Sequence, residues 1–143
     1  MRWRNILDFL GWPHPPQRDE VKEIEPRPLS EREFGWVREI LACNSDWRSA
    51  DCSETRVVAE GPNCGGYSIY LKAPNPESST SESTSEMVGQ LWIETKNRLT
   101  INIQLSQWQG RLREIYYFAI DRKGRNRDLP DTWEELSRQA VNF

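Results

Sequence analysis

Residues suited to acid–base or nucleophilic chemistry are few in this 143-residue chain, and they are poorly placed for it. The one histidine, His14, stands among prolines in a stretch that reads as a linker. It therefore cannot serve as a well-placed base for a serine or cysteine nucleophile. The chain also has no phosphate-binding loop and no glycine fingerprint for dinucleotides. We predict no catalytic residue and no cofactor.

The three cysteines do not form a metal-binding pattern. Eight residues separate Cys43 from Cys52, and eleven separate Cys52 from Cys64, whereas structural zinc sites use closely spaced cysteine pairs. The three could still meet in space and share a fourth ligand, but free thiols are the preferred interpretation. An odd number of cysteines without a secretory signal argues against a disulfide framework and favours a reducing, cytoplasmic setting.

Three carboxylates are expected in or beside strands, namely Glu60, Glu94 and Glu114. Two of them in one pocket could support acid–base chemistry. Carboxylates in such positions more often lie at the wet end of a strand or pair with an arginine, such as Arg56 or Arg113. A small ligand-binding domain or hydrolase that uses these carboxylates is the alternative function.

Charge and hydropathy argue against two classes of partner. The net charge of −3 gives the whole chain no attraction to nucleic acid or anionic membranes. A loop from Arg122 to Arg127 carries four positive charges. It is either a solvated turn or a contact for phosphate or an acidic partner, and no nucleic-acid recognition motif accompanies it. The apolar stretch near the N-terminus is far too short to span a membrane.

The elements that must position any site are arranged around one predicted β-hairpin. Residues 99–106 alternate apolar and polar side chains without a break, and residues 112–120 form a second strand-like run. The short connection between them contains Gly110. We expect the apolar positions of the first run to face the core, and these are Leu99, Ile101, Ile103 and Leu105.

Along the chain, helices are predicted both before and after the strands. Residues 3–10 have helical spacing, and residues 13–28 read as a proline-rich linker. Ser30 and Glu33 form a capping box that begins a helix over residues 31–42. The expected apolar stripe of that helix is Phe34, Val37, Ile40 and Leu41. Asp131 and Glu134 resemble a second capping box, which predicts a final helix.

Further strands are expected over residues 56–59, 67–71 and 87–95, with a polar, low-complexity excursion at residues 74–86. Short turns between strands favour antiparallel neighbours. The predicted fold is therefore α+β, an antiparallel meander sheet of about five strands with helices packed on one face. We divide the chain into a short helix with a linker over residues 1–27 and a single domain over residues 28–143.

The most informative candidate surface is the outer face of this sheet. If the apolar positions of residues 99–106 face the core, the polar positions between them face outward, and neighbouring strands add aromatic residues. Aromatic side chains among small neutral polar ones are typical of protein-binding surfaces. A protein partner, a second copy or the N-terminal helix could cover this face. The predicted partner-binding residues are Tyr70, Trp92, Asn102, Gln104, Ile115 and Tyr117.

Several stretches together resemble a family of small, uncharacterised bacterial domains. They are residues 28–33 at the start of a helix, residues 56–58 before a turn, residues 110–112 at the start of a strand, and residues 129–130. The resemblance covers residues 28–133 and implies a domain outline without catalytic residues. Members often carry more cysteine in the turn, where only Cys64 stands here. We expect a non-enzymatic cytoplasmic binding protein, of inhibitor or immunity type.

Overall fold

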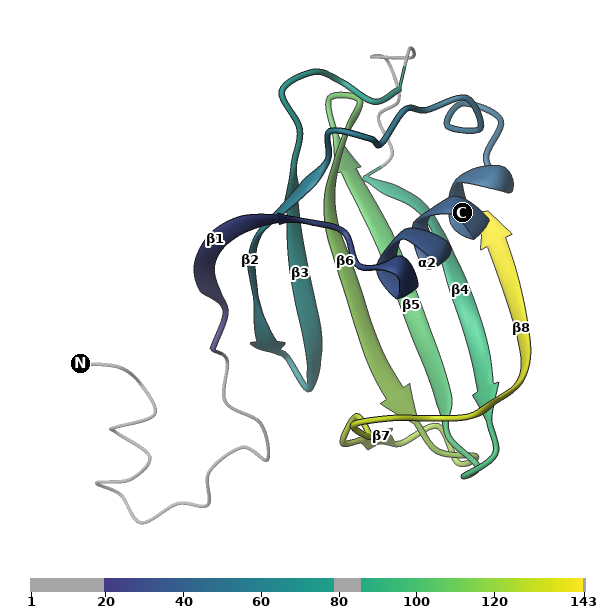
Figure 1. Ribbon diagram of the computed structural model, residues 1–143. Coiled ribbons are helices and arrows are strands. Elements are labelled where there is room, and N and C mark those ends of the chain that lie inside the picture. Colours follow the sequence, from purple (N-terminus) through teal and green to yellow (C-terminus); the bar gives the residue numbers. More distant parts are fainter. Residues whose placement is uncertain (1–19, 79–85, 143) are drawn as a thin grey trace.

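The computed structural model describes residues 20–78 and 86–142, which form one antiparallel sheet of eight strands and one α-helix (Figure 1). The helix predicted over residues 3–10 lies outside the described residues. The elements are β1 (Lys22–Pro28), α2 (Glu31–Ala42), β2 (Arg56–Asn63), β3 (Gly66–Lys72), β4 (Met87–Thr95), β5 (Thr100–Trp108), β6 (Arg111–Ile120), β7 (Asn126–Arg127) and β8 (Glu135–Asn142).

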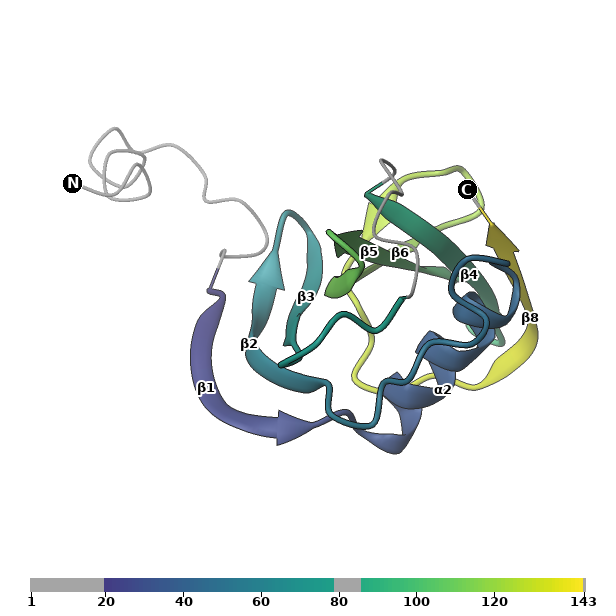
Figure 2. The ribbon, with the colours of Figure 1, turned by 90° about the horizontal axis from the view of Figure 1, so that it is seen from above.

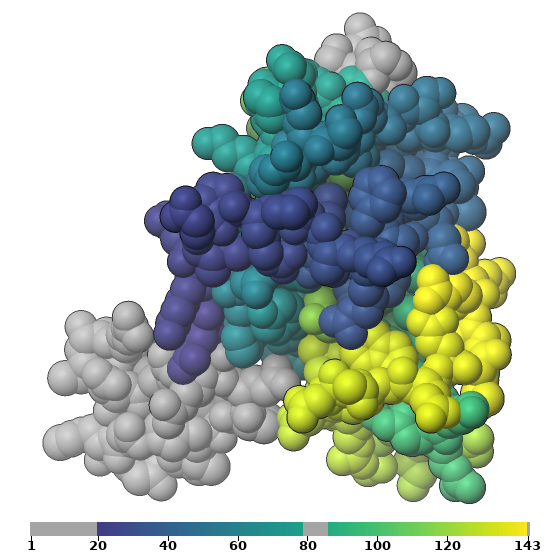
Figure 3. Space-filling view, in the orientation of Figure 1, coloured from purple at the N-terminus to yellow at the C-terminus, as the bar shows by residue number. Residues whose placement is uncertain are grey.

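The strands follow the order β1-β2-β3-β6-β5-β4-β8, and β7 pairs with β6. The sheet curls around the core, with α2 on its concave side, so its other face is convex (Figure 2). We call that convex side the outer face. In the space-filling view, α2 and the segment after it cover the concave side of the sheet (Figure 3). The antiparallel α+β class is confirmed, but within the described residues the sheet has eight strands and not five, and one helix packs on it where several were expected. The sheet is also not a simple meander, because β3 pairs with β6 and β4 pairs with β8.

Helix α2 begins as its capping box predicts. The Glu33 amide donates to Ser30 Oγ at 3.1 Å, and the Ser30 amide donates to Glu33 Oε1 at 2.8 Å. The buried stripe runs through Trp36, Val37, Ile40 and Leu41, the spacing of an amphipathic helix. Phe34, which we expected in that stripe, is 39% exposed.

The predicted final helix is wrong, because Glu135–Asn142 form strand β8 along β4. The edge of β4 offers a full row of backbone partners, and this tertiary pairing overrides the local helix signal. At the other edge, residues 22–28 pair with β2 as strand β1 instead of forming a linker. Pro26 and Pro28 are tolerated there because an edge strand needs hydrogen bonds on one side only.

The β5–β6 hairpin is confirmed and forms the centre of the sheet. The side chains of Ile101, Ile103 and Leu105 are completely buried. Gln109 and Gly110 form a two-residue turn with φ of 53° and 77°, the conformation that hairpins favour. The core is completed by residues of the helix, the loop after it and the flanking strands, including Trp36, Ile40, Trp47, Leu91, Ile93 and Leu112.

A bulge interrupts β6 near its start. Ser106 pairs with Glu114 while Gln107 pairs with Leu112, so Arg113 is an extra residue with no partner across the hairpin. An extra residue reverses the alternation of every side chain that follows it. As a result, Leu112 and Ile115 both face the core.

Candidate functional site

The outer face brings together four of the six predicted partner-binding residues. Asn102 pairs with Trp92 of β4, and Gln104 lies two residues further along β5 on the same face. Tyr70 of β3 pairs with Glu114 of β6, which in turn pairs with Ser106 of β5. Directly paired residues share a face of the sheet, so Tyr70, Trp92, Asn102 and Gln104 all lie on the outer side.

Ile115 and Tyr117 do not lie on the outer face. They are 1% and 7% exposed, and they pair with Leu105 and Ile103 on the core side. The Tyr117 ring lies 5.2 Å from that of Trp36, and burial raises the pKa of Tyr117 to about 12. The prediction of an outward position is wrong because it extended the alternation from Leu112 through the bulge.

The same bulge places two other aromatic residues outside. Tyr116 pairs with Gln104, and Phe118 pairs with Asn102. Their rings lie 5.7 Å apart, and Tyr116 Oη donates to the Cys64 carbonyl at 2.9 Å. We call the half-buried residues Tyr70, Trp92, Tyr116 and Phe118 the outer aromatic patch. Sequence reasoning missed Tyr116 and Phe118, and the apolar pair three residues apart, Leu112 and Ile115, was the signal that could have revealed them.

A hydrogen-bonded row of amides forms the floor of this patch. Asn102 Nδ2 donates to Gln90 Oε1 at 3.1 Å, and Gln104 Nε2 donates to Asn102 Oδ1 at 2.9 Å. Asn102 itself is 0% exposed. It therefore positions Gln90 and Gln104, and those two half-buried amides are the ones within reach of a partner.

The three strand carboxylates do not share a site. Glu60 lies on β2, three strands away from β5, and is bound by Arg27. Glu114 accepts from Ser68 Oγ at 2.6 Å on the outer face. Glu94 pairs with Thr100, which pairs with Ile120 near the end of β6. Ile120 is six residues from Glu114, so Glu94 and Glu114 are about 20 Å apart along the strand direction. This arrangement gives no support to acid–base catalysis by any two of them.

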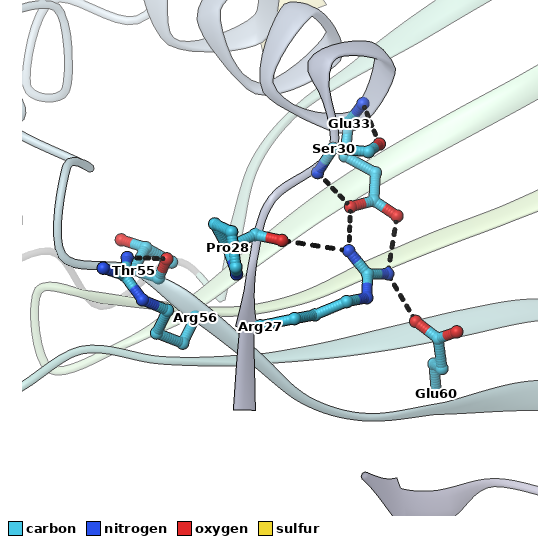
Figure 4. A network of polar contacts seen from close by, with 7 residues as sticks. All are labelled: Arg27, Pro28, Ser30, Glu33, Thr55, Arg56 and Glu60. Atoms are coloured by element: carbon cyan, nitrogen blue, oxygen red, sulfur yellow. Dashed lines mark hydrogen bonds and ion pairs between the residues drawn. The ribbon is translucent and has the colours of Figure 1, made fainter. Parts of the chain in front are cut away.

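Glu60 belongs to a structural ion network that links three elements (Figure 4). Arg27 of β1 binds Glu33 of α2 at 2.8 Å and 3.0 Å and Glu60 of β2 at 2.5 Å. Burial alone would raise the pKa of Glu33, but hydrogen bonds from Arg27 and Ser30 outweigh it and hold that pKa below its ordinary value. Arg27 binds both carboxylate oxygens of Glu33 and one of Glu60, so this network fixes the start of α2 against the sheet.

The cysteines are separate free thiols, two exposed and one, Cys52, half-buried. Burial raises the pKa of Cys52 to about 11, so it is a neutral thiol at physiological pH. Within residues 20–78 and 86–142, no three Cys, His, Asp or Glu side chains are grouped as metal ligands. His14 lies outside the described residues. No described helix is long and apolar enough to cross a membrane.

No family model, curated protein or solved structure matches this chain. The resemblance to small bacterial domains therefore stays a prediction.

Proposed function

We propose that the protein is a non-enzymatic binding protein whose outer sheet face docks on another protein. The observation that carries this proposal is the outer aromatic patch around the amide pair Gln90 and Gln104. Tryptophan and tyrosine dominate the energetically important positions of protein interfaces, and neutral amides are suited to hydrogen bonding around them. An inhibitor or immunity-type role is the finer form of this proposal.

The patch is held on strands and is therefore preorganised. It spans β3, β6, β5 and β4, which is about 14 Å at the usual strand spacing of about 4.8 Å. Tyr116 is fixed by its hydrogen bond to Cys64, and Gln104 by its bond to Asn102. Side chains that are already ordered lose little conformational entropy when a partner binds.

The shape of the face favours a different protein over a second copy. Because the outer face is convex (Figure 2), two copies placed face to face would touch over a small area. A stable interface buries about 800 Å² on each side. A partner with a concave surface or a flexible segment can reach that area by following the curve of the sheet.

The test starts by capturing partners from the cells that make this protein and identifying them by mass spectrometry. Binding is then measured with purified components. The double variant Trp92→Ala plus Tyr116→Ala should weaken the affinity about 700-fold, because interface hot spots contribute about 2 kcal/mol each and every 1.4 kcal/mol is tenfold.

Phe34→Ala is the matched control, since Phe34 is an exposed aromatic residue on α2, away from the outer face. It should leave the affinity unchanged. Equal binding by the double variant and the unmodified protein would refute the proposal. The proposal would also be refuted if sedimentation showed that the unmodified protein is a dimer and that the double variant is a monomer, because the face would then bind a second copy.

A further inference from the structure

A second surface, at the turn of the β5–β6 hairpin, has the features of a small-ligand site. A cavity of about 580 Å³ opens there, which is within the usual size range of ligand pockets. Its walls combine positive charge, an exposed indole and an apolar floor. The lining residues are Leu71, Lys72, Ala73, Glu86, Trp108, Arg111, Leu112 and Arg113.

The hairpin geometry directs three of these side chains to one place. Trp108 and Arg111 form the last cross-strand pair before the two-residue turn, so their side chains are neighbours. Arg113 is the extra residue of the β6 bulge, and bulges commonly redirect a side chain in this way. Trp108 is 56% exposed, although an indole is costly to leave in water.

Hydrogen bonds hold the hairpin turn beside the cavity in place. The Gly110 carbonyl accepts from the amides of Glu77 and Ser78 at 3.0 Å and 3.1 Å. The Gly110 amide donates to Gln107 Oε1 at 3.1 Å, and the Leu112 amide donates to Glu77 Oε2 at 2.8 Å. The turn that holds Trp108 and Arg111 is therefore fixed before any ligand arrives.

Within residues 20–78 and 86–142, no ion pair engages the positive charges that line the cavity. The side chains of Lys72, Arg111 and Arg113 make no hydrogen bond or ion pair with another described residue, and Arg111 is near enough to Glu77 to interact with it electrostatically. With Glu86 as the one carboxylate, the lining carries three positive charges and one negative, a sum of +2, while the whole chain carries −3. A cleft of one sign concentrates oppositely charged ligands, and bound anion would relieve the repulsion among the three cations.

We propose that this cavity binds a small molecule in which an oxyanion, a phosphate or a carboxylate, is attached to an aromatic ring. Arginine forms paired hydrogen bonds to both kinds of oxyanion. The Trp108 ring offers a stacking surface for the aromatic part, and Leu71, Ala73 and Leu112 supply the apolar floor. The site is separate from the outer aromatic patch in its ligand and its principal residues, so it stands or falls independently of the proposed protein binding.

The experiment uses the full chain and four probes: phenyl phosphate, benzoate, inorganic phosphate and phenol. Binding is followed by NMR through the indole signal of Trp108 and the backbone amides of Arg111 and Arg113. Phenyl phosphate or benzoate should shift these signals and bind about tenfold or more tightly than inorganic phosphate or phenol. The stronger of the two identifies the oxyanion. The Trp92 indole, on the outer face, should not move.

Variants separate the two halves of the site. Arg111→Ala should weaken the preferred probe about tenfold or more, because a charge-assisted hydrogen bond is lost. Trp108→Ala should reduce the affinity for the preferred probe to that for inorganic phosphate. The binding of inorganic phosphate itself should stay unchanged. Lys72→Ala provides a second charge variant outside the hairpin if Arg111→Ala does not fold.

Arg122→Ala is the matched control, because it removes the same charge from an exposed position beyond the far end of β6. It should bind the probes like the unmodified protein. Equal weakening by Arg122→Ala and Arg111→Ala would show attraction by net charge only and would overturn the proposal. Millimolar probe with no shift of the Trp108 indole would overturn it as well.

Discussion

Leu112 and Ile115 of β6 both point into the core although they are three positions apart, where regular alternation would put them on opposite faces. The extra residue Arg113 makes this possible. One bulge therefore decides which aromatic residues of β6 lie in the core and which lie on the outer face. It puts Tyr117 in the core and places Tyr116 and Phe118 on the outer face.

This arrangement predicts opposite outcomes for neighbouring positions of one strand. Ile115→Ala should lower the free energy of unfolding by about 2–5 kcal/mol, because it leaves a cavity in a packed core. Phe118→Ala, on the half-buried outer face, should cost clearly less. Urea unfolding of both variants measures the difference. A larger loss from Phe118→Ala would show that the strand faces the other way.

Local signals in the sequence were sufficient for the parts of the fold that depend on neighbouring residues. The capping box of Ser30 and Glu33 and the alternation of residues 99–106 act over a few positions, and both are present as predicted. The edge strands depend on distant partners instead. β8 is a strand because β4 is beside it, and nothing within residues 131–142 shows that neighbour.

The candidate site was partly predictable for the same reason. Trp92, Asn102 and Gln104 lie on the part of the β4–β5 hairpin with regular pairing, so alternation placed them correctly. Beyond the β6 bulge the alternation is reversed, so Ile115 and Tyr117 were misplaced. The cavity at Trp108 combines residues from β3, β5 and β6 with Glu86, which precedes β4, and no spacing along the chain brings these together.

Ile101 provides the most direct test of the core face. Its side chain is completely buried at the centre of the sheet, and Ile101→Asp would bury a carboxylate with no partner, which costs several kcal/mol. We expect loss of the folded state, seen as loss of near-ultraviolet circular dichroism. The control is Thr100→Asp, on the outer face beside it, which should fold. A cooperatively melting Ile101→Asp protein would contradict the assigned alternation.

Arg27 should matter for stability beyond its place on an edge strand. Arg27→Met leaves Glu33 buried without its cation and should lower the free energy of unfolding by about 1–3 kcal/mol at neutral pH. The double variant with Glu33→Gln should recover part of this loss, because the unpaired charge is gone. A double-mutant cycle in urea measures the coupling, and additive effects would contradict a specific pair.

The same variant should reverse one contribution to acid stability. In the unmodified protein the pKa of Glu33 is lowered from 4.5, so its stabilising effect is present above that pH and is lost on acidification. Without Arg27, burial raises this pKa, and protonation of Glu33 should then stabilise the fold. The loss caused by Arg27→Met should therefore shrink between pH 7 and pH 4. A constant difference across this range would contradict the assignment.

Glu77 gives a pH dependence of opposite sign. Burial raises its pKa to about 7 from an ordinary 4.5, and its Oε1 has no hydrogen-bond partner among the described residues. Because the folded state holds this proton more tightly, the stabilising contribution is complete below pH 4.5 and is lost as the pH rises through 7. The difference of about 2.5 pH units corresponds to about 3 kcal/mol.

Glu77→Gln keeps an acceptor for the Leu112 amide and cannot ionise, so it should remove this loss and be the more stable protein at pH 8. Thermal melts from pH 5 to pH 8 test this, with exposed Glu54→Gln as the control, and parallel curves for Glu77→Gln and the unmodified protein would show that Glu77 does not titrate in this range.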